Sequence, residues 1–163
     1  DTSGIDLVSD ISSIPAPDGS FDAILCSEVI EHIPAPLAAL AEFRRLLAPG
    51  GRLILTAPFA SLVHFAPYHF SSGFSRYWYE LHLPKHGFEI DELTANGDWF
   101  DMLRQELMRW WKVSKSSGSL LWPVALVAGY SCALLLRLPH RKKPSELSCF
   151  GWHCIATKQA DST

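Results

Sequence analysis

The sequence predicts an α/β fold built around a mostly parallel sheet. Three neighbouring segments carry this prediction: an almost continuous apolar run at 21–27, a helical pattern at 37–47 and a second apolar run at 52–57. Continuous apolar runs are typical of parallel strands that are buried on both faces of a sheet. Short links join the three segments, so they form a strand–helix–strand unit, whose crossover is right-handed in almost all proteins.

Turn residues and apolar spacing set the boundaries of these segments and of the others. Pro34 and Pro36 open the helix, because Pro is tolerated in a first helical turn, and Pro49-Gly50-Gly51 makes a tight turn into the next strand. The other predicted elements are a short strand at 5–9, a turn at 14–20, helices at 75–86 and 98–115, and strands at 88–94 and 148–157.

Length, charge and cysteine content bound the class of protein. The chain has 163 residues, which is enough for one domain with a sizeable core. Its net charge of -3 gives no bulk electrostatic support for nucleic-acid binding. The cysteines form no CxxC pair and no signal peptide is evident, so we expect buried thiols in a cytoplasmic protein.

An uncharged segment precedes the predicted last strand. Residues 120–136 carry no charge, and basic residues flank them on both sides, among them the run 141–143. We treat 116–147 as an apolar and basic insertion. One interpretation is peripheral contact of 120–143 with an anionic membrane surface. A helix that crosses the membrane is disfavoured, because it would separate the last strand from its sheet. The alternative to membrane contact is a buried helix or a dimer contact.

An aromatic region follows the second apolar strand. Residues 59–86 are rich in Phe, Tyr and Trp, and we expect them to form a lid on the substrate side of the sheet. The same region contains His64 and His69, which follow a strand end and are candidate general bases near neutral pH. The alternative is an aromatic lid in which both histidines are incidental.

Several motifs of the chain together resemble a known enzyme family. The stretch FDAILCSEVIEHIPAP, followed by ALAEFRRLLAPGGRLILTAPF, is similar to the C-terminal half of class I S-adenosylmethionine-dependent methyltransferases, in particular the type 11 subgroup. The segment YHFSSGFSRYWYELHLPKHGFEI resembles a later part of that subgroup. The resemblance implies a Rossmann-like sheet whose last strand is antiparallel.

The resemblance also implies roles for individual residues. Asp10 and the backbone of Ile11 would bind the adenine of S-adenosylmethionine, and Ser27 and Glu28 would face its methionine end. His32 would line the pocket close to the transferred methyl group. We therefore take Asp10, Ile11, Ser27 and Glu28 as cofactor-binding candidates, and His32 with His69 as catalytic candidates.

The family's Gly-rich turn and its ribose-binding acidic residue do not occur in these residues. The chain starts at Asp1 rather than Met, so we expect a single partial methyltransferase domain, incomplete at its N-terminus. In this interpretation the strand at 5–9 has no neighbour, and the strand at 21–27 presents an apolar edge that favours aggregation. The fragment alone is then inactive, and the full-length protein is active.

A metal-dependent variant of this chemistry is an open alternative. Glu28, Glu31 and His32 place two carboxylates and an imidazole within one helical turn. Some small-RNA and quinone-biosynthesis O-methyltransferases are similar here and use a divalent metal. His64 or His69 could add a ligand, and an oxygen-rich set suits Mg²⁺ or Mn²⁺. We favour the interpretation without a metal.

The sequence therefore predicts methyl transfer from S-adenosylmethionine to a small-molecule or lipid-like acceptor. Nucleic acid is disfavoured as a substrate. The rival hypothesis is a degenerate, non-catalytic methyltransferase-like interaction module that pairs with another chain to complete its sheet.

Overall fold

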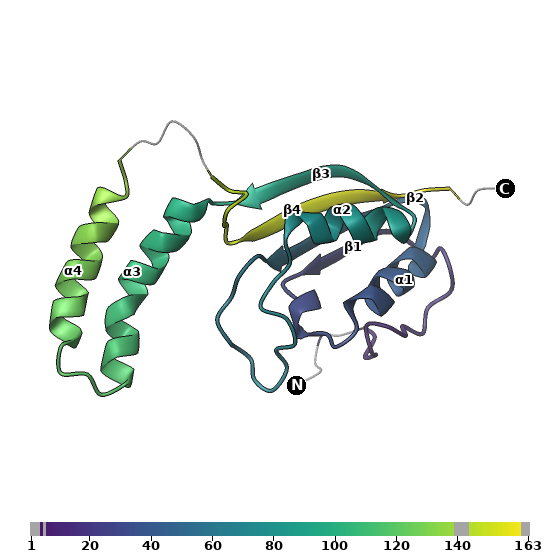
Figure 1. The fold of residues 1–163 in the computed structure, drawn as a ribbon. Coiled ribbons are helices and arrows are strands. Elements are labelled where there is room, and N and C mark those ends of the chain that lie inside the picture. The colour runs from purple at the N-terminus through teal and green to yellow at the C-terminus, as the bar shows by residue number, and fades with distance from the viewer. Residues whose placement is uncertain (1–3, 5, 139–143, 161–163) are drawn as a thin grey trace. The chain divides into compact units, whose positions relative to one another are not determined.

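The computed structural model describes residues 4, 6–138 and 144–160, and it divides the chain into two compact units (Figure 1). The first unit comprises residues up to Thr94 and from Gly151 onward, and the second spans Ala95–Phe150. The second unit is wider than the predicted insertion at 116–147. The expectation of one partial domain with an insertion stays a prediction.

The first unit contains a four-stranded sheet with the order β1-β2-β4-β3. The strands are β1 (Phe21–Ser27), β2 (Leu47–Pro58), β3 (Phe88–Asn96), whose last residues reach into the second unit, and β4 (Gly151–Lys158). β1 pairs with β2 in parallel, with Leu25 opposite Ile54, and β4 pairs with β2 antiparallel, with Ile155 opposite Ile54. The predicted fold class, including its antiparallel last strand, is confirmed.

The helices of the first unit pack on the sheet, and one of them forms the crossover that the sequence predicts (Figure 1). They are the 3-10 helix η1 (Ile30–His32), α1 (Pro36–Leu46) and α2 (Arg76–Lys85). α1 packs against β2 and α2 against β4. Leu40 and Phe43 of α1 are almost fully buried, together with Leu53 and Leu55 of β2. This layer forms the core of the unit.

One face of the sheet is covered and the other is partly open. Along β2 the buried residues alternate with exposed ones, and Ile54 is 36% exposed. Its neighbour in the register, Leu25 of β1, is 69% exposed. The expectation that β1 is buried on both faces is therefore wrong for the described residues, because α1 and α2 leave the Leu25 side of the strand bare.

The predicted strand at 5–9 does not form in the part of the chain that the structure describes. Ile5 lies outside that part, residues 7–9 have no regular structure, and Val8 is 69% exposed. Asp10 makes only an isolated bridge to Ser13. The physical reason is the missing partner: β1 is an edge of the described sheet, and an extended segment without a neighbour leaves its backbone groups to water.

The Pro49-Gly50-Gly51 segment belongs to β2 rather than to a separate turn before it. β2 starts at Leu47, directly after α1, and its pairing with β1 shifts register between Leu47 and Arg52. The three residues form an irregularity of the kind found in β-bulges, which absorbs the sharp exit from the helix.

An arginine anchors the chain that leads into β1. Arg45 of α1 donates hydrogen bonds to the carbonyl oxygens of Ile14 and Ala16 and forms ion pairs with Asp18 and Glu42. These contacts lower the pKa of Glu42 to about 2, chiefly through its hydrogen bonds with the Arg45 side chain. The segment 14–18 is thereby fixed although it has no regular secondary structure.

The second unit is a helical hairpin of α3 (Trp99–Ser116) and α4 (Trp122–Leu135). Asp98 caps α3 by accepting hydrogen bonds from the amides of Phe100 and Asp101. The helices approach closely at Gly129, where a Cβ atom would lie 2.3 Å from the carbonyl oxygen of Leu107. Within the described residues, no helix is both long and apolar enough to cross a membrane.

Candidate functional site

The carboxyl ends of β1 and β2 are joined by a chain of polar side chains. The Ser27 hydroxyl lies 2.8 Å from the Thr56 hydroxyl, and Thr56 donates a hydrogen bond of 3.0 Å to the Glu28 carboxylate. The Glu28 amide donates to the carbonyl oxygen of Thr56, and Glu28 itself has a φ of 53°, an uncommon conformation outside glycine. Ser27 and Glu28, two of the predicted cofactor residues, are therefore brought together and exposed.

Thr56 is a member of this chain that the sequence analysis missed. It is the polar residue near the end of the apolar strand β2, two positions before Pro58. A hydroxyl at that place in an otherwise apolar strand was the available signal.

Asp10 and Ile11 lie in the loop before β1. The Asp10 carboxylate is exposed and accepts hydrogen bonds from the amide and the hydroxyl of Ser12, which lower its pKa. Ile11 is half-buried. The described contacts of Asp10 are local, so its predicted role toward the adenine ring stays a prediction.

Glu31 is the most deeply buried acid of the site. Its side chain is fully buried in η1, and neither carboxylate oxygen has a hydrogen-bond partner among the described residues. Oε1 lies 3.6 Å from Nε2 of His32. Burial raises the pKa of the Glu31 carboxyl, and the charge of Glu28 raises it further, whereas His32 and His64 act in the opposite direction.

The long loop between β2 and α2 is tied at its neck and along its length. At the neck, the amide of Phe74 donates to the carbonyl oxygen of Pro58, and Ser61 donates to the carbonyl oxygen of Ser72. Further along, the amides of Phe70 and Ser71 both donate to the backbone carbonyl of Glu31. These bonds hold the loop against η1.

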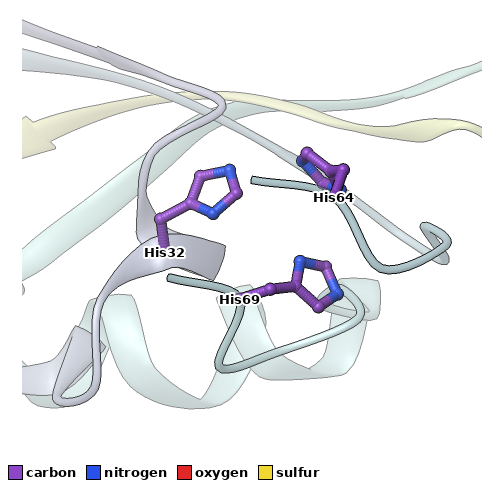
Figure 2. A group of neighbouring side chains, drawn as sticks. All are labelled: His32, His64 and His69. Atoms are coloured by element: carbon purple, nitrogen blue, oxygen red, sulfur yellow. The ribbon is translucent and has the colours of Figure 1, made fainter. Parts of the chain in front are cut away.

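Three histidines meet where this loop lies against η1 (Figure 2). They are His32 of η1 and His64 and His69 of the loop, and each offers a ring nitrogen within 4.8 Å of the others. Ring centroids are 4.8 Å apart for His32 and His64, 4.9 Å for His64 and His69, and 6.0 Å for His32 and His69. We call this group the histidine cluster.

The two predicted catalytic residues, His32 and His69, both belong to the histidine cluster. Imidazoles can accept a proton near neutral pH or bind a metal ion, so the cluster supports either use. Their catalytic role stays a prediction, as does the role of 59–86 as a lid.

Sequence comparisons match limited stretches of the chain. Residues 3–55 match the family model of a methyltransferase domain. A 38-residue stretch is 53% identical to the ubiquinone biosynthesis O-methyltransferase of Xanthomonas oryzae pv. oryzae, covering 23% of this chain and 16% of that protein. An uncharacterized 37.1 kDa protein in a transposon of Streptomyces fradiae is 47% identical over 49 residues, covering 30% of this chain and 14% of that one. The matches thus span a small part of these relatives.

Structure comparisons cover almost the whole chain. One similar structure, from Galdieria sulphuraria, is described as a sarcosine dimethylglycine methyltransferase. It matches with a TM-score of 0.55 and 16% sequence identity, and the match covers 93% of this chain and 58% of that one. The [4+2]-cyclase SpnF matches with a TM-score of 0.53 and 18% sequence identity, covering 93% of this chain and 54% of that one. A phosphoethanolamine N-methyltransferase of Haemonchus contortus, solved in complex with S-adenosyl-L-methionine, matches with a TM-score of 0.50 and 16% sequence identity. This match covers 93% of this chain and 36% of that one.

These comparisons agree with the motifs quoted from the sequence. At such low identity the solved structures establish the fold alone, while the family model adds the methyltransferase-domain sequence of residues 3–55. The resemblance stated from the sequence is therefore confirmed: residues 3–55 match the family model of a methyltransferase domain, and the fold of the chain is similar to that of solved methyltransferase structures.

Proposed function

We propose that this protein transfers the methyl group of S-adenosylmethionine to a small-molecule or lipid-like acceptor. One observation carries the proposal: the hydroxyl–carboxylate chain of Ser27, Thr56 and Glu28 and the histidine cluster come from the carboxyl ends of β1 and β2 and from the segments that follow these ends. Ligands of open α/β sheets bind beyond the carboxyl ends of the strands. The family model over residues 3–55 and the S-adenosyl-L-methionine complex of a structural neighbour support this choice of cofactor.

The residues present fit one side of that cofactor. The exposed carboxylate of Glu28 and the exposed hydroxyl of Ser27 can accept hydrogen bonds from an ammonium group at the methionine end. The exposed Asp10 carboxylate can accept from an adenine amino group. When bound, S-adenosylmethionine supplies an electrophilic methyl group on a sulfonium. Within this proposal, and in the protein without a bound metal, one of the two predicted catalytic residues, His32 or His69, takes up the proton that the acceptor releases.

We assign the activity to the complete reading frame and expect the chain alone to be inactive and poorly soluble. Residues 1–163 contain no Gly-rich turn of the kind that holds the methionine part in this family. In addition, Leu25 on the edge strand β1 is 69% exposed, and bare apolar edges favour aggregation.

Binding of S-adenosylhomocysteine tests the proposed function. We expect the product of the complete reading frame to bind this ligand in isothermal titration, and the Asp10→Ala variant to bind it about tenfold more weakly, as for the loss of one charge-assisted hydrogen bond. The matched control is Ser12→Ala, which removes the hydroxyl that Asp10 holds but keeps the carboxylate. A folded protein that does not bind the ligand would refute the proposal.

The rival hypothesis is a non-catalytic module that completes its sheet with another chain. The exposed Leu25 beside Ile54 on the open face of the sheet favours it, because such apolar surface is usually covered. Absence of S-adenosylhomocysteine binding together with a stable heteromeric complex would support this alternative.

We also propose that the α3–α4 hairpin contacts an anionic membrane surface, which suits a lipid-like acceptor. α4 contains no charged residue, and many of the apolar side chains on it and next to its two ends are exposed: Leu120, Leu121, Val124, Val127, Leu134, Leu135 and Leu138. Exposed basic residues stand at both ends, namely Lys112, Lys115 and Arg137. Apolar area with basic flanks is typical of segments that lie in a lipid interface. The predicted basic run 141–143 lies outside the described residues.

Vesicle sedimentation tests the membrane contact. We expect the protein to bind vesicles that contain anionic phosphatidylserine, and to bind neutral phosphatidylcholine vesicles clearly less, since each basic residue near an anionic surface contributes about 1 kcal/mol. Replacing Val124 and Val127 with serine should reduce binding severalfold, because both side chains are more than half exposed. The control changes Val63, an equally exposed valine of the other unit, to serine. Equal binding by all three proteins would contradict the proposal.

A further inference from the structure

We propose that His32, His64 and His69 form a binding site for a divalent transition metal of the Zn²⁺ class. The three ligands come from η1 and from the loop between β2 and α2, which the backbone bonds to Glu31 hold together. The proposed site differs from the metal alternative raised by the sequence, which used Glu28 and Glu31 as oxygen ligands. The histidine cluster instead offers three imidazoles (Figure 2).

The distances between the ring nitrogens of the cluster are close to those in a metal site. Zn²⁺ binds imidazole nitrogen at about 2.0–2.1 Å, so the nitrogens of a tetrahedral site are about 3.4 Å apart. In the structure the three candidate nitrogens lie within 4.8 Å of one another. A contraction of at most about 1.4 Å therefore completes the site, and a small shift of the exposed His64 side chain can supply it.

Hydrogen bonds to backbone carbonyls leave one ring nitrogen of His32 and one of His64 available to a metal. Nδ1 of His32 donates to the carbonyl oxygen of Tyr68, and Nδ1 of His64 donates to the carbonyl oxygen of Leu62. Each ring therefore carries its proton on Nδ1 and keeps a lone pair on Nε2. Donation from the second ring nitrogen to a backbone carbonyl is the usual support of a metal-binding histidine.

The third ring, that of His69, belongs to a half-buried residue. Both nitrogens of His69 are buried and neither has a hydrogen-bond partner among the residues that the structure describes. Buried polar atoms are rarely left unsatisfied in native proteins. A metal ion between His69 and the two neighbouring rings would satisfy one of these nitrogens.

A buried carboxylate beside the cluster supplies the negative charge that a cation needs. Glu31 is fully buried, has no described hydrogen-bond donor to its carboxylate, and lies 3.6 Å from Nε2 of His32. An isolated carboxylate in this position is costly, whereas one next to a divalent cation is paired.

The donor set decides the class of metal. Three neutral imidazoles suit Zn²⁺, Co²⁺ or Ni²⁺, while Mg²⁺ prefers oxygen ligands in an octahedral arrangement. Three protein ligands also leave a fourth position for a water or a substrate oxygen. If the proposed methyl transfer holds, this position would take the acceptor hydroxyl, whose pKa a bound cation lowers. Metal binding itself does not rest on that function.

Metal titration tests the site without cofactor or acceptor. We expect the protein to bind one equivalent of Zn²⁺ in isothermal titration, to show the visible absorption of Co²⁺ held by nitrogen ligands, and to bind Mg²⁺ at least a hundredfold more weakly. His64→Ala should weaken Zn²⁺ binding by at least tenfold and remove the Co²⁺ absorption. The matched control is His153→Ala, which alters an exposed histidine of β4 outside the cluster.

A second variant keeps the test decisive if one ligand variant misfolds. Glu31→Gln preserves the side-chain volume but removes the charge beside His32, and we expect it to weaken Zn²⁺ binding by about tenfold or more, as for other outer-shell partners. Circular dichroism verifies that each variant is folded. Equal Zn²⁺ affinity in the parent, His64→Ala and Glu31→Gln proteins, or no binding by the folded parent, would overturn the proposal. Neither result bears on S-adenosylhomocysteine binding, which tests the proposed function separately.

Discussion

Replacing Gly73 with alanine is expected to release the loop that carries His64 and His69 while leaving the sheet folded. Gly73 has a φ of 150°, a conformation that side chains rarely adopt, and a Cβ atom there would lie 2.3 Å from the carbonyl oxygen of Phe59. The backbone at the neck of the loop must therefore move, at a cost of about 1–3 kcal/mol for the conformation alone. We expect the amides of Phe70 and Ser71 to exchange with solvent at least about tenfold faster.

Amide hydrogen exchange measures this effect residue by residue. The matched control is Gly50→Ala, because Gly50 also has a positive φ, of 75°, but a Cβ atom there would meet nothing within 4 Å. Gly50→Ala should lower overall stability by about 1–2 kcal/mol without changing exchange at Phe70 and Ser71. Unchanged exchange at these amides in Gly73→Ala would show that the neck of the loop does not control the position of the histidines.

Replacing Phe43 with alanine is expected to lower the free energy of unfolding by about 3–5 kcal/mol. The Phe43 ring is 2% exposed and lies on the face of α1 that covers the sheet, so its removal leaves a cavity between the two layers. A loss of this size is a large part of the 5–15 kcal/mol that stabilises a typical protein. Urea denaturation followed by circular dichroism gives the change directly.

A neighbouring residue of the same helix serves as the control. Leu37 is 38% exposed, so Leu37→Ala removes side-chain contacts without opening a core cavity and should cost less than about 1 kcal/mol. Comparable losses for the two variants would mean that α1 does not pack on the sheet as described.

Local patterns predicted most elements of the fold because those elements depend on nearby residues. The apolar run of β1 and the helical spacing of α1 are short-range signals, and the structure reproduces both within a residue or so. The strand at 5–9 was predicted by the same local logic and failed, because a strand also requires a neighbour with which to pair. The exposure of Leu25 was missed for a related reason. Burial depends on which helices cover a face of the sheet, and the local sequence of a strand does not determine this.

The candidate site was predictable in part. The end of β1 is marked in the sequence by Ser27 and Glu28, and the structure places both there. The meeting of His32 with His64 and His69 depends instead on the path of a long loop, which backbone bonds to Glu31 determine. Spacing along the chain does not encode such bonds, so the sequence could suggest His64 or His69 as a metal ligand added to His32 but could not show that all three histidines lie together.

The position of β4 inside the sheet has a consequence for synthesis on the ribosome. β4 lies between β2 and β3, yet about 90 residues separate the end of β2 at Pro58 from the start of β4 at Gly151. At about 5–20 residues per second, roughly 5–20 s pass before β4 is made. β2 lacks this neighbour for the whole of that interval, and β3 lacks it for the later part, from Asn96 to Gly151. Nascent chains are therefore expected to expose two unpaired strand edges until translation is nearly complete, which is the period when chaperones would matter most.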